Sequence, residues 1–250
     1  MTTQSKGFVL VASREYRYYA WACNLAEGIK DYYPEAKICI VTEEQFADER
    51  LEVADDVIWC DNNYRAKLWG MAQTPYDLTF YCDVDMEIVG PGIENVFDRL
   101  GDNDLMFAAL HKEHYYVFND DPFPGGRMEL CGAVCVYRKT ERTIKFLNDW
   151  YELYQKHAVE QSWWPTNEEG YPDYENFPER LRKWDQFSLM WLTQKTPEND
   201  DLKITSFGSV EEDLRWNYWS LLDRVKDPMP EGTVLLHLSC MADKAVYSYK

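Results

Sequence analysis

Short apolar runs alternate with amphipathic stretches along the first third of this chain. The apolar runs predict buried β-strands at Gly7–Ala12, Lys37–Thr42, Asp56–Cys60 and Leu78–Cys82. Helical spacing follows Ser13 and ends at Pro34, with an apolar face made of Tyr18, Ala22, Leu25, Ala26 and Ile29. A shorter helix is expected from Arg65 to Ala72. Strands and helices that alternate at these spacings indicate an α/β fold with a mostly parallel sheet.

The rest of the chain continues the alternation, and it contains no internal repeat. Helices are expected at 91–100, Glu141–His157 and 184–192, and strands at 104–110, Glu129–Tyr137, 203–207 and Thr233–Ser239. In the helix after Glu141, the residues expected to face inward are Ile144, Leu147, Tyr151 and Tyr154. We therefore predict a single domain over residues 1–250.

Residues 159–183 break the pattern. This stretch is rich in proline, aromatic and acidic residues and has no period, which predicts a long surface loop or flap. Its aromatic side chains would stack on the flat face of a ligand, form a small core within the flap, or make an oligomer contact, and the sequence favours the last two; they are Trp163, Trp164, Tyr171, Tyr174 and Phe177.

Composition and charge restrict the partners of this protein. The formal net charge of −18 argues against binding to a nucleic-acid polymer, because phosphate backbones are bound by clustered Lys and Arg. No apolar run is long enough to predict a signal sequence or a transmembrane helix. The seven cysteines are scattered without a CxxC pair, as is typical of reduced thiols, so we expect a cytoplasmic protein.

Two acids mark the end of the fourth predicted strand. In "LTFYCDVDMEIVG", the strand runs directly into Asp83 and Asp85. Ligands of α/β sheets bind at the carboxyl ends of parallel strands. Residues i and i+2 point the same way in an extended chain, so the two carboxylates converge and repel unless a cation lies between them. A hard divalent ion such as Mg²⁺ or Mn²⁺ fits such oxygen ligands.

Other interpretations of the two acids remain open at this stage. Acids at the end of a strand also serve as helix caps or solvated turn residues. The Ca²⁺ loop of an EF-hand needs further acids that are missing here. A phosphatase with Asp83 as nucleophile is disfavoured, because in haloacid-type phosphatases the motif lies near the N-terminus.

Several segments, in order, are similar to the metal-dependent GT-A glycosyltransferases, in particular to the glycogenin and bacterial galactosyltransferase-like group. "FVLVAS" resembles the first strand and nucleotide-contacting loop, and "FYCDVDMEIV" resembles the DxD strand of the group. "LCGAVCVY" is similar to its "NaGvmv" strand, and "WDQFSLMWL" resembles its Asp-Gln helix start. "LRWNYW" is similar to its aromatic-Asn segment, and "LLHLSCMADK" resembles its His-x-x-Gly-x-x-Lys ending. The resemblance implies a GT-A-like, Rossmann-like mixed sheet flanked by helices.

The same resemblance implies roles for individual residues. Asp83, Asp85 and His237 would hold the metal, and Asp185 and Gln186 would lie beside the donor sugar. Contacts to the nucleotide sugar are expected at Ala12, Arg14, Lys67, Asp83, Val84, Cys131, Gly132 and Lys244. Two positions depart from the group, since Cys131 replaces the usual Asn and Lys244 lies one residue further from His237.

Structural roles compete with these assignments. His237 would be a satisfied core histidine, Arg14 a solvated residue of the first helical turn, and Lys244 an exposed C-terminal lysine. Asp185 would be the N-cap of its helix, a role that is compatible with a place in the active site.

The function expected from the resemblance is transfer of a sugar from a nucleotide-diphosphate sugar, with a UDP-sugar favoured, to a carbohydrate, lipid or protein acceptor. Mn²⁺ or Mg²⁺ would be the cofactor, and the configuration at the anomeric carbon would be retained. The alternative is a GT-A-like module that binds a nucleotide or glycan without turnover. The sequence leaves the donor sugar, the acceptor and the oligomeric state open.

Overall fold

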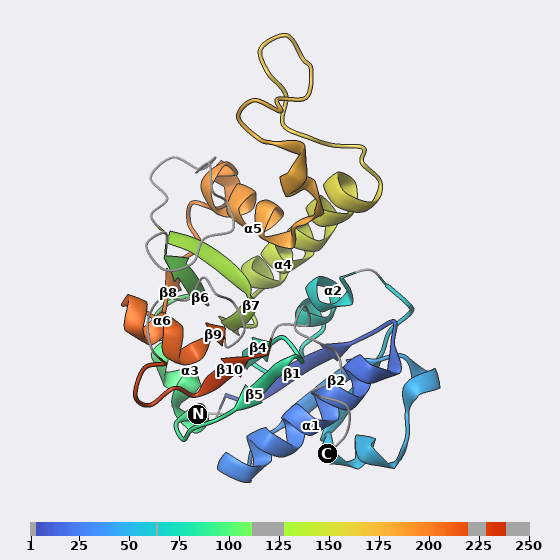
Figure 1. Ribbon diagram of the computed structural model, residues 1–250, viewed down its shortest axis with the longest axis vertical. Helices are drawn as coiled ribbons and strands as arrows, with labels where there is room; N and C mark the ends of the chain where they lie inside the picture. The colour runs from blue at the N-terminus through green and yellow to red at the C-terminus, as the bar shows by residue number, and fades with distance from the viewer. Residues whose placement is uncertain (1–3, 64, 112–127, 220–228, 239–250) are drawn as a thin grey trace.

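A seven-stranded sheet forms the centre of the protein. The computed structural model describes residues 4–63, 65–111, 128–219 and 229–238, with backbone alone at positions 111 and 128. The strands lie in the order β3-β2-β1-β4-β7-β6-β8 (Figure 1). Their bounds are β1 Lys6–Ala12, β2 Ile38–Thr42, β3 Asp56–Trp59, β4 Leu78–Cys82, β6 Leu105–His111, β7 Met128–Arg138 and β8 Ile204–Ser206.

Only β7 runs against the other strands of this sheet. β1 pairs in parallel with β2 and β4, and β7 pairs antiparallel with β4 and β6. The mixed, mostly parallel sheet expected from the sequence is therefore confirmed. The carboxyl ends of β1 and β4 meet at one edge, where the two acids of the DVD turn follow β4.

Helices cover both faces of the sheet, because alternate residues of each central strand are apolar on both sides. In β1, Phe8 and Leu10 pack on one face and Val9 and Val11 on the other. The first face is covered by α1 (Tyr16–Tyr32), α3 (Val96–Arg99) and α6 (Val210–Trp216). The second is covered by α2 (Ala66–Ala72), α4 (Glu141–Tyr154) and α5 (Asp185–Gln194). None of the helices in these described ranges has the length and apolarity needed to cross a bilayer.

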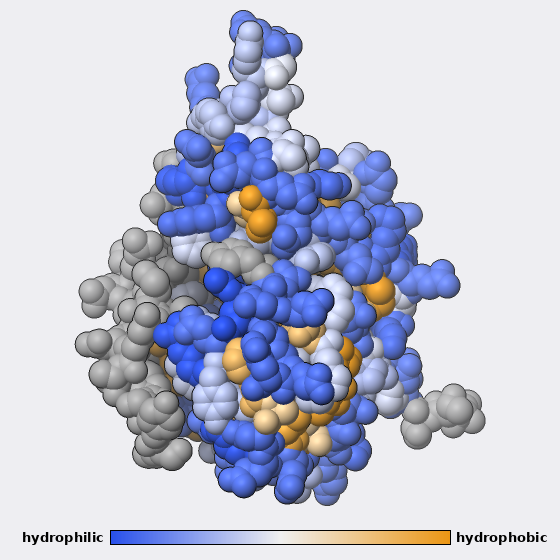
Figure 2. Space-filling view, turned by 90° about the vertical axis from the view of Figure 1, so that its right-hand side faces the viewer, coloured by the Kyte–Doolittle hydropathy of each residue, from blue (hydrophilic) through white to orange (hydrophobic). Residues whose placement is uncertain are grey.

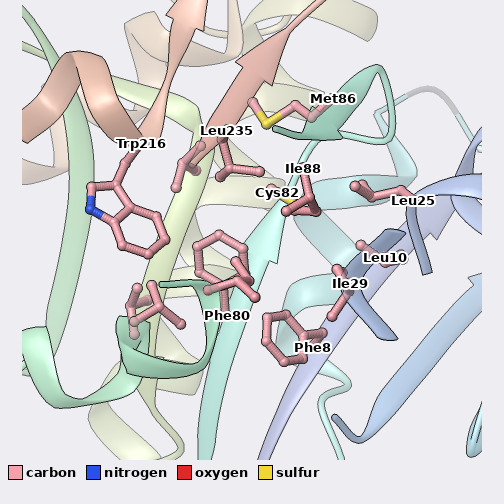
Figure 3. Packing of buried hydrophobic residues seen from close by; sticks show 14 of the residues in the cluster. Phe8, Leu10, Leu25, Ile29, Phe80, Cys82, Met86, Ile88, Trp216 and Leu235 are labelled. Atoms are coloured by element: carbon pink, nitrogen blue, oxygen red, sulfur yellow. The ribbon is translucent and has the colours of Figure 1, made fainter. Parts of the chain in front are cut away.

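A second, three-stranded sheet packs on the α1 face. It consists of β5 (Met86–Ile88), β10 (Leu235–His237) and β9 (Tyr218–Trp219), with β10 in the middle. Figure 3 shows Met86, Ile88 and Leu235 of this small sheet in the same core as Phe80 and Trp216. This packing holds the small sheet directly beside the end of β4. His237, at the end of β10, therefore lies beside the DVD turn although it is distant in the sequence.

The structure corrects several element bounds. The last predicted strand, Thr233–Ser239, is shorter at Leu235–His237 and belongs to the small sheet. The helix predicted over Glu141–His157 is α-helical to Tyr154 and continues as a π-helix over Gln155–Val159. Its fully buried face is made of Thr143, Phe146, Leu147, Trp150 and Tyr154. Ile144 and Tyr151 also face inward as expected, but they are only half-buried and pack at the margin of the same core.

The long segment after this helix projects from the molecule (Figure 1). Its first predicted residue, Val159, still belongs to the π-helix, and its last five form a 3-10 helix, Glu179–Lys183, so the loop itself spans 160–178. Figure 2 shows the projecting segment as pale to blue, which means weakly to strongly hydrophilic.

Candidate functional site

The DVD turn joins the two sheets. β4 ends at Cys82, and β5 begins at Met86, so the turn consists of the three residues between them. The N–H of Asp83 donates to the Ala133 carbonyl of β7 at 2.8 Å, and the Asp85 carbonyl accepts from the N–H of Leu238 at 2.8 Å. One end of the turn is thus fixed to the large sheet and the other to the small sheet.

Three side chains converge at this turn. Asp83, Asp85 and His237 each offer one ligand atom, and these atoms all lie within 4.8 Å of one another. The antiparallel pairing of β10 with β5 places His237 opposite Met86, next to Asp85, whose Oδ1 lies 3.4 Å from His237 Nε2. Two carboxylate oxygens and one imidazole nitrogen fit Mn²⁺ or Mg²⁺ far better than a soft metal. Metal binding by these three residues stays a prediction, but the structure brings them together.

His237 is held from two further sides. Its Nδ1 lies 2.9 Å from Asn217 Oδ1, and the ring of Trp219 packs against the imidazole at a centroid distance of 4.0 Å. β9 runs parallel to β10 and places Asn217 and Trp219 there. The sequence pattern drew attention to the segment that contains Asn217, but it gave this residue no role in the site.

A second polar network, centred on Lys67, lies beside the cluster of Asp83, Asp85 and His237. Its Nζ lies 3.1 Å from Asp83 Oδ1 and 3.0 Å from Asp185 Oδ2, and it approaches the Gly132 carbonyl at 3.5 Å. Burial opposes the charge on Lys67, but the two carboxylates outweigh it and raise its pKa. Tyr81 adds a hydrogen bond of 2.5 Å from its hydroxyl to Asp83 Oδ1. Asp83 therefore belongs to both clusters.

Asp185 is a buried, ionised carboxylate in this network. Burial favours its neutral form, but Lys67 and Arg65 outweigh burial and hold the pKa of Asp185 well below its usual range. Asp185 is the first residue of α5, and the cap position is occupied by Trp184, which makes no side-chain cap. The alternative role of Asp185 as the helix N-cap was wrong. The ionised carboxylate instead faces the cations of α2.

Arg65 is a site residue that sequence reasoning missed. It precedes α2 in the left-handed conformation, with φ of 64°, which is uncommon for a residue other than glycine and concentrates at functional sites. Asp185 is the chief cause that raises the pKa of its guanidinium. Its closeness to Asp185 depends on a long-range contact between α2 and α5, and the chain pattern gave no signal for it.

Gln186 also has a buried partner that the sequence did not reveal. Its Nε2 donates a hydrogen bond to Glu129 Oε1, and Glu129 on β7 is fully buried. This hydrogen bond holds the Gln186 side chain against β7.

The other residues predicted to contact a nucleotide sugar differ in their burial and contacts. Ala12 and Val84 are buried, so only their backbone is suited to meet a ligand. Arg14 is exposed with φ of 78°, and its N–H donates to the buried Glu43 carboxylate at 2.5 Å, which fixes the loop after β1. Cys131 is buried and contacts Asn217, while Lys244 lies outside the described residues.

Gly132 is required by close packing. A Cβ atom at this position would come within 2.8 Å of the Trp150 ring, so no larger residue fits without displacing the indole. Trp150 in turn donates its Nε1–H to the Asp185 carbonyl at 2.8 Å. The glycine thus lets α4 pack tightly behind the site and support the start of α5.

The aromatic residues of the loop divide into buried and exposed ones. Trp164 is buried and stacks on Phe187 at 4.5 Å, while Trp163 and Phe177 pack edge-on against Trp191. Tyr171 and Tyr174 are exposed. The three inner aromatic residues therefore attach the loop to α5 as part of the core on that face of the large sheet, and they do not form a separate core within the loop.

No protein-family model matches this chain, and no curated protein sequence is similar to it. Solved structures do resemble it. The crystal structure of galactosyltransferase LgtC in complex with donor and acceptor sugar analogs superposes with a TM-score of 0.56 at 15% identity, covering 92% of this chain and 86% of that one. An active-site Gln-to-Glu mutant of LgtC gives a TM-score of 0.54 at 15% identity and the same coverage. At this low identity the likeness shows the fold, and the chain has the GT-A fold.

Proposed function

We propose that this protein is a metal-dependent glycosyltransferase that moves a sugar from a nucleotide-diphosphate sugar to an acceptor, within a single catalytic domain. The observation that carries the proposal is the convergence of Asp83, Asp85 and His237 at the carboxyl edge of a GT-A sheet. The likeness to LgtC, which was crystallised in complex with donor and acceptor sugar analogs, supports the same class of ligands here.

The excess of negative charge in the site favours the binding of a metal ion. Asp83, Asp85 and Asp185 bring three carboxylates together, against the two cations Lys67 and Arg65. Like charges ~4 Å apart cost about 4 kcal/mol at an effective dielectric constant near 20, so a diphosphate would be repelled by this edge. Mn²⁺ or Mg²⁺, when bound, supplies a Lewis acid that stabilises charge on the departing nucleoside diphosphate.

The protein's own residues have separable tasks in this proposal. Asp83, Asp85 and His237 hold the ion, and the hydrogen bond from Lys67 orients the Asp83 carboxylate. Asp185 and Gln186 lie at the start of α5, where we place the donor sugar, and their contacts to Lys67 and Glu129 fix their positions. We further propose a UDP-sugar donor and retention of configuration, following the group that the sequence resembles.

The alternative is a GT-A module that binds a nucleotide or glycan without turnover. The observation that favours it is Cys131, a buried residue whose thiol contacts Asn217 and which stands where the related group usually has a polar amide. A donor would lose one polar contact there. The metal cluster and the Asp185 network would still be intact in such a module.

The experiment that tests the function measures transfer and hydrolysis of a panel of UDP-sugars with Mn²⁺, with and without a chelator. We expect turnover that the chelator abolishes and that Asp85→Ala reduces to background. Asp102→Ala removes an exposed acid in a turn outside the candidate site. It is the matched control and should behave as wild type. UDP and Mn²⁺ binding without any turnover would favour the binding module, and chelator-resistant turnover would refute the metal role.

A further inference from the structure

We propose that Asn217 is a positioning residue that holds His237 in the tautomer with the proton on Nδ1, so that the Nε2 lone pair faces Asp83 and Asp85. This inference rests on the proposed metal site, but it concerns residues that hold the imidazole and do not touch the ion. The observations that support it are the contacts of the Asn217 amide oxygen and of the amide nitrogen.

The first contact is the hydrogen bond to the imidazole. Asn217 is 2% exposed, and its Oδ1 lies 2.9 Å from His237 Nδ1. A carbonyl oxygen only accepts, so the imidazole nitrogen that faces it must carry the proton. In a neutral ring the proton on Nδ1 leaves a lone pair on Nε2, the atom that lies 3.4 Å from Asp85 Oδ1.

The second contact fixes which end of the amide faces the ring. Asn217 Nδ2 donates to Cys131 Sγ at 3.4 Å. The reverse orientation would turn the carbonyl towards a thiol, which is a weak donor, and turn the amide N–H towards the imidazole. In the structure the amide N–H is directed at Cys131 Sγ, and this contact leaves the carbonyl oxygen on His237 Nδ1.

Without this arrangement the metal-free site would favour the other tautomer. A proton on Nε2 would give a hydrogen bond towards the Asp85 carboxylate, whereas a lone pair there meets an anionic acceptor. The Asn217 contact opposes that state and keeps Nε2 ready for a cation. The Trp219 ring, tilted by 38° against the imidazole, restricts rotation of the ring out of this position. Partners of this kind set the tautomer of many metal-binding histidines.

The direct test is imidazole ¹⁵N NMR of metal-free protein at ~pH 8.5, about two units above the ordinary histidine pKa. His237→Gln assigns the resonance among the four histidines. We expect the Nδ1–H pattern in wild type and in Asn217→Asp, which keeps an acceptor oxygen. Asn217→Leu, similar in size but without an acceptor, should shift the ring towards Nε2–H. An unchanged tautomer in Asn217→Leu would overturn the proposal.

The second measurement is Mn²⁺ affinity by calorimetry on the same variants. Asn217→Leu should weaken binding by roughly 10–100-fold, the usual cost of removing such a partner. Asn217→Asp should bind as wild type or more tightly, because a carboxylate makes the imidazole more basic. Cys131→Ala should give a loss in the same direction but smaller. Unchanged affinity in Asn217→Leu would also overturn the proposal.

Two controls separate this inference from the proposed function. Asn103→Leu removes an asparagine whose Nδ2 donates to the nearby Leu100 carbonyl, and it should change neither readout. If wild type binds no Mn²⁺, the proposed function fails, while the ¹⁵N pattern still decides whether Asn217 sets the tautomer. Circular dichroism of each variant shows whether any loss reflects unfolding.

Discussion

Two buried histidines lie in opposite surroundings. His157, in the π-helix after α4, is fully buried among the rings of Tyr154, Trp164 and Phe187. Neither of its nitrogens has a hydrogen-bond partner within the part of the chain that the structure describes. His237, which is 4% exposed, instead meets an amide oxygen through Nδ1 and a carboxylate through Nε2.

The two histidines are distinguished by the polar groups around their rings, because both rings are buried. Burial lowers the pKa of His157 to about 4 and outweighs the opposing influence of the Arg182 backbone, so this ring is neutral at physiological pH and fills space between α4 and α5. The His237 ring is equally buried, yet each nitrogen faces a polar atom and the ring stands beside two acids. Burial alone therefore does not identify a functional histidine, and the partners of its two nitrogens do.

The largest effect is expected at Lys67, which pairs both with Asp83, one of the proposed metal ligands, and with Asp185 of α5. Lys67→Met would leave both carboxylates without this cation, and removing one partner of a buried ion pair costs about 3–5 kcal/mol. We expect the lower end of this range, because Arg65 still faces Asp185. Urea denaturation measures the loss.

Lys145→Met is the matched control, because it breaks an exposed i,i+4 pair with Asp149 that is worth well under ~1 kcal/mol. A Lys67→Met protein as stable as this control would show that the Lys67 pairs do not stabilise the fold and serve the site alone.

The sequence predicted the central strands well and the small sheet poorly. β4 is confirmed at Leu78–Cys82, because four apolar residues and the β-branched Thr79, bounded by Asp77 and Asp83, leave little choice. β5 and β9, with three and two residues, are too short for any period to show. Their existence depends on pairing with β10, a segment more than a hundred residues further along than β5.

The residues of the candidate site likewise divide into those that could be predicted from the sequence and those that could not. Asp83 and Asp85 could be predicted because their spacing is local, and the family resemblance added His237 and Lys67. Arg65, Glu129 and Asn217 enter the site through contacts between distant elements, and a single sequence contains no signal of such contacts. The clear difference between His157 and His237 likewise appears only in three dimensions.

The next largest effect is stabilisation by metal. A ligand that binds only the folded state at 100 times its dissociation constant adds about 2.7 kcal/mol to the free energy of unfolding. We expect this gain with Mn²⁺ in wild type and in His157→Phe, and its loss in His237→Phe. Thermal unfolding with and without a chelator provides the measurement. A gain that survives in His237→Phe would show that the imidazole is not a ligand and that the contrast between the two histidines is wrong.

The smallest effect is the pH dependence that His157 gives to stability. Its pKa is about 4 in the fold and ~6.5 in the unfolded chain, so between these values the unfolded chain binds the proton and the folded protein does not. Stability is therefore lost as the pH falls from ~6.5 towards 4, and this group contributes about 2 kcal/mol of loss between pH 7.5 and pH 5. His157→Phe keeps an aromatic ring in the same box and should reduce the acid sensitivity by that amount. Urea denaturation of metal-free protein at the two pH values measures the difference, and equal acid sensitivity in both proteins would mean that His157 finds a polar partner when it is protonated.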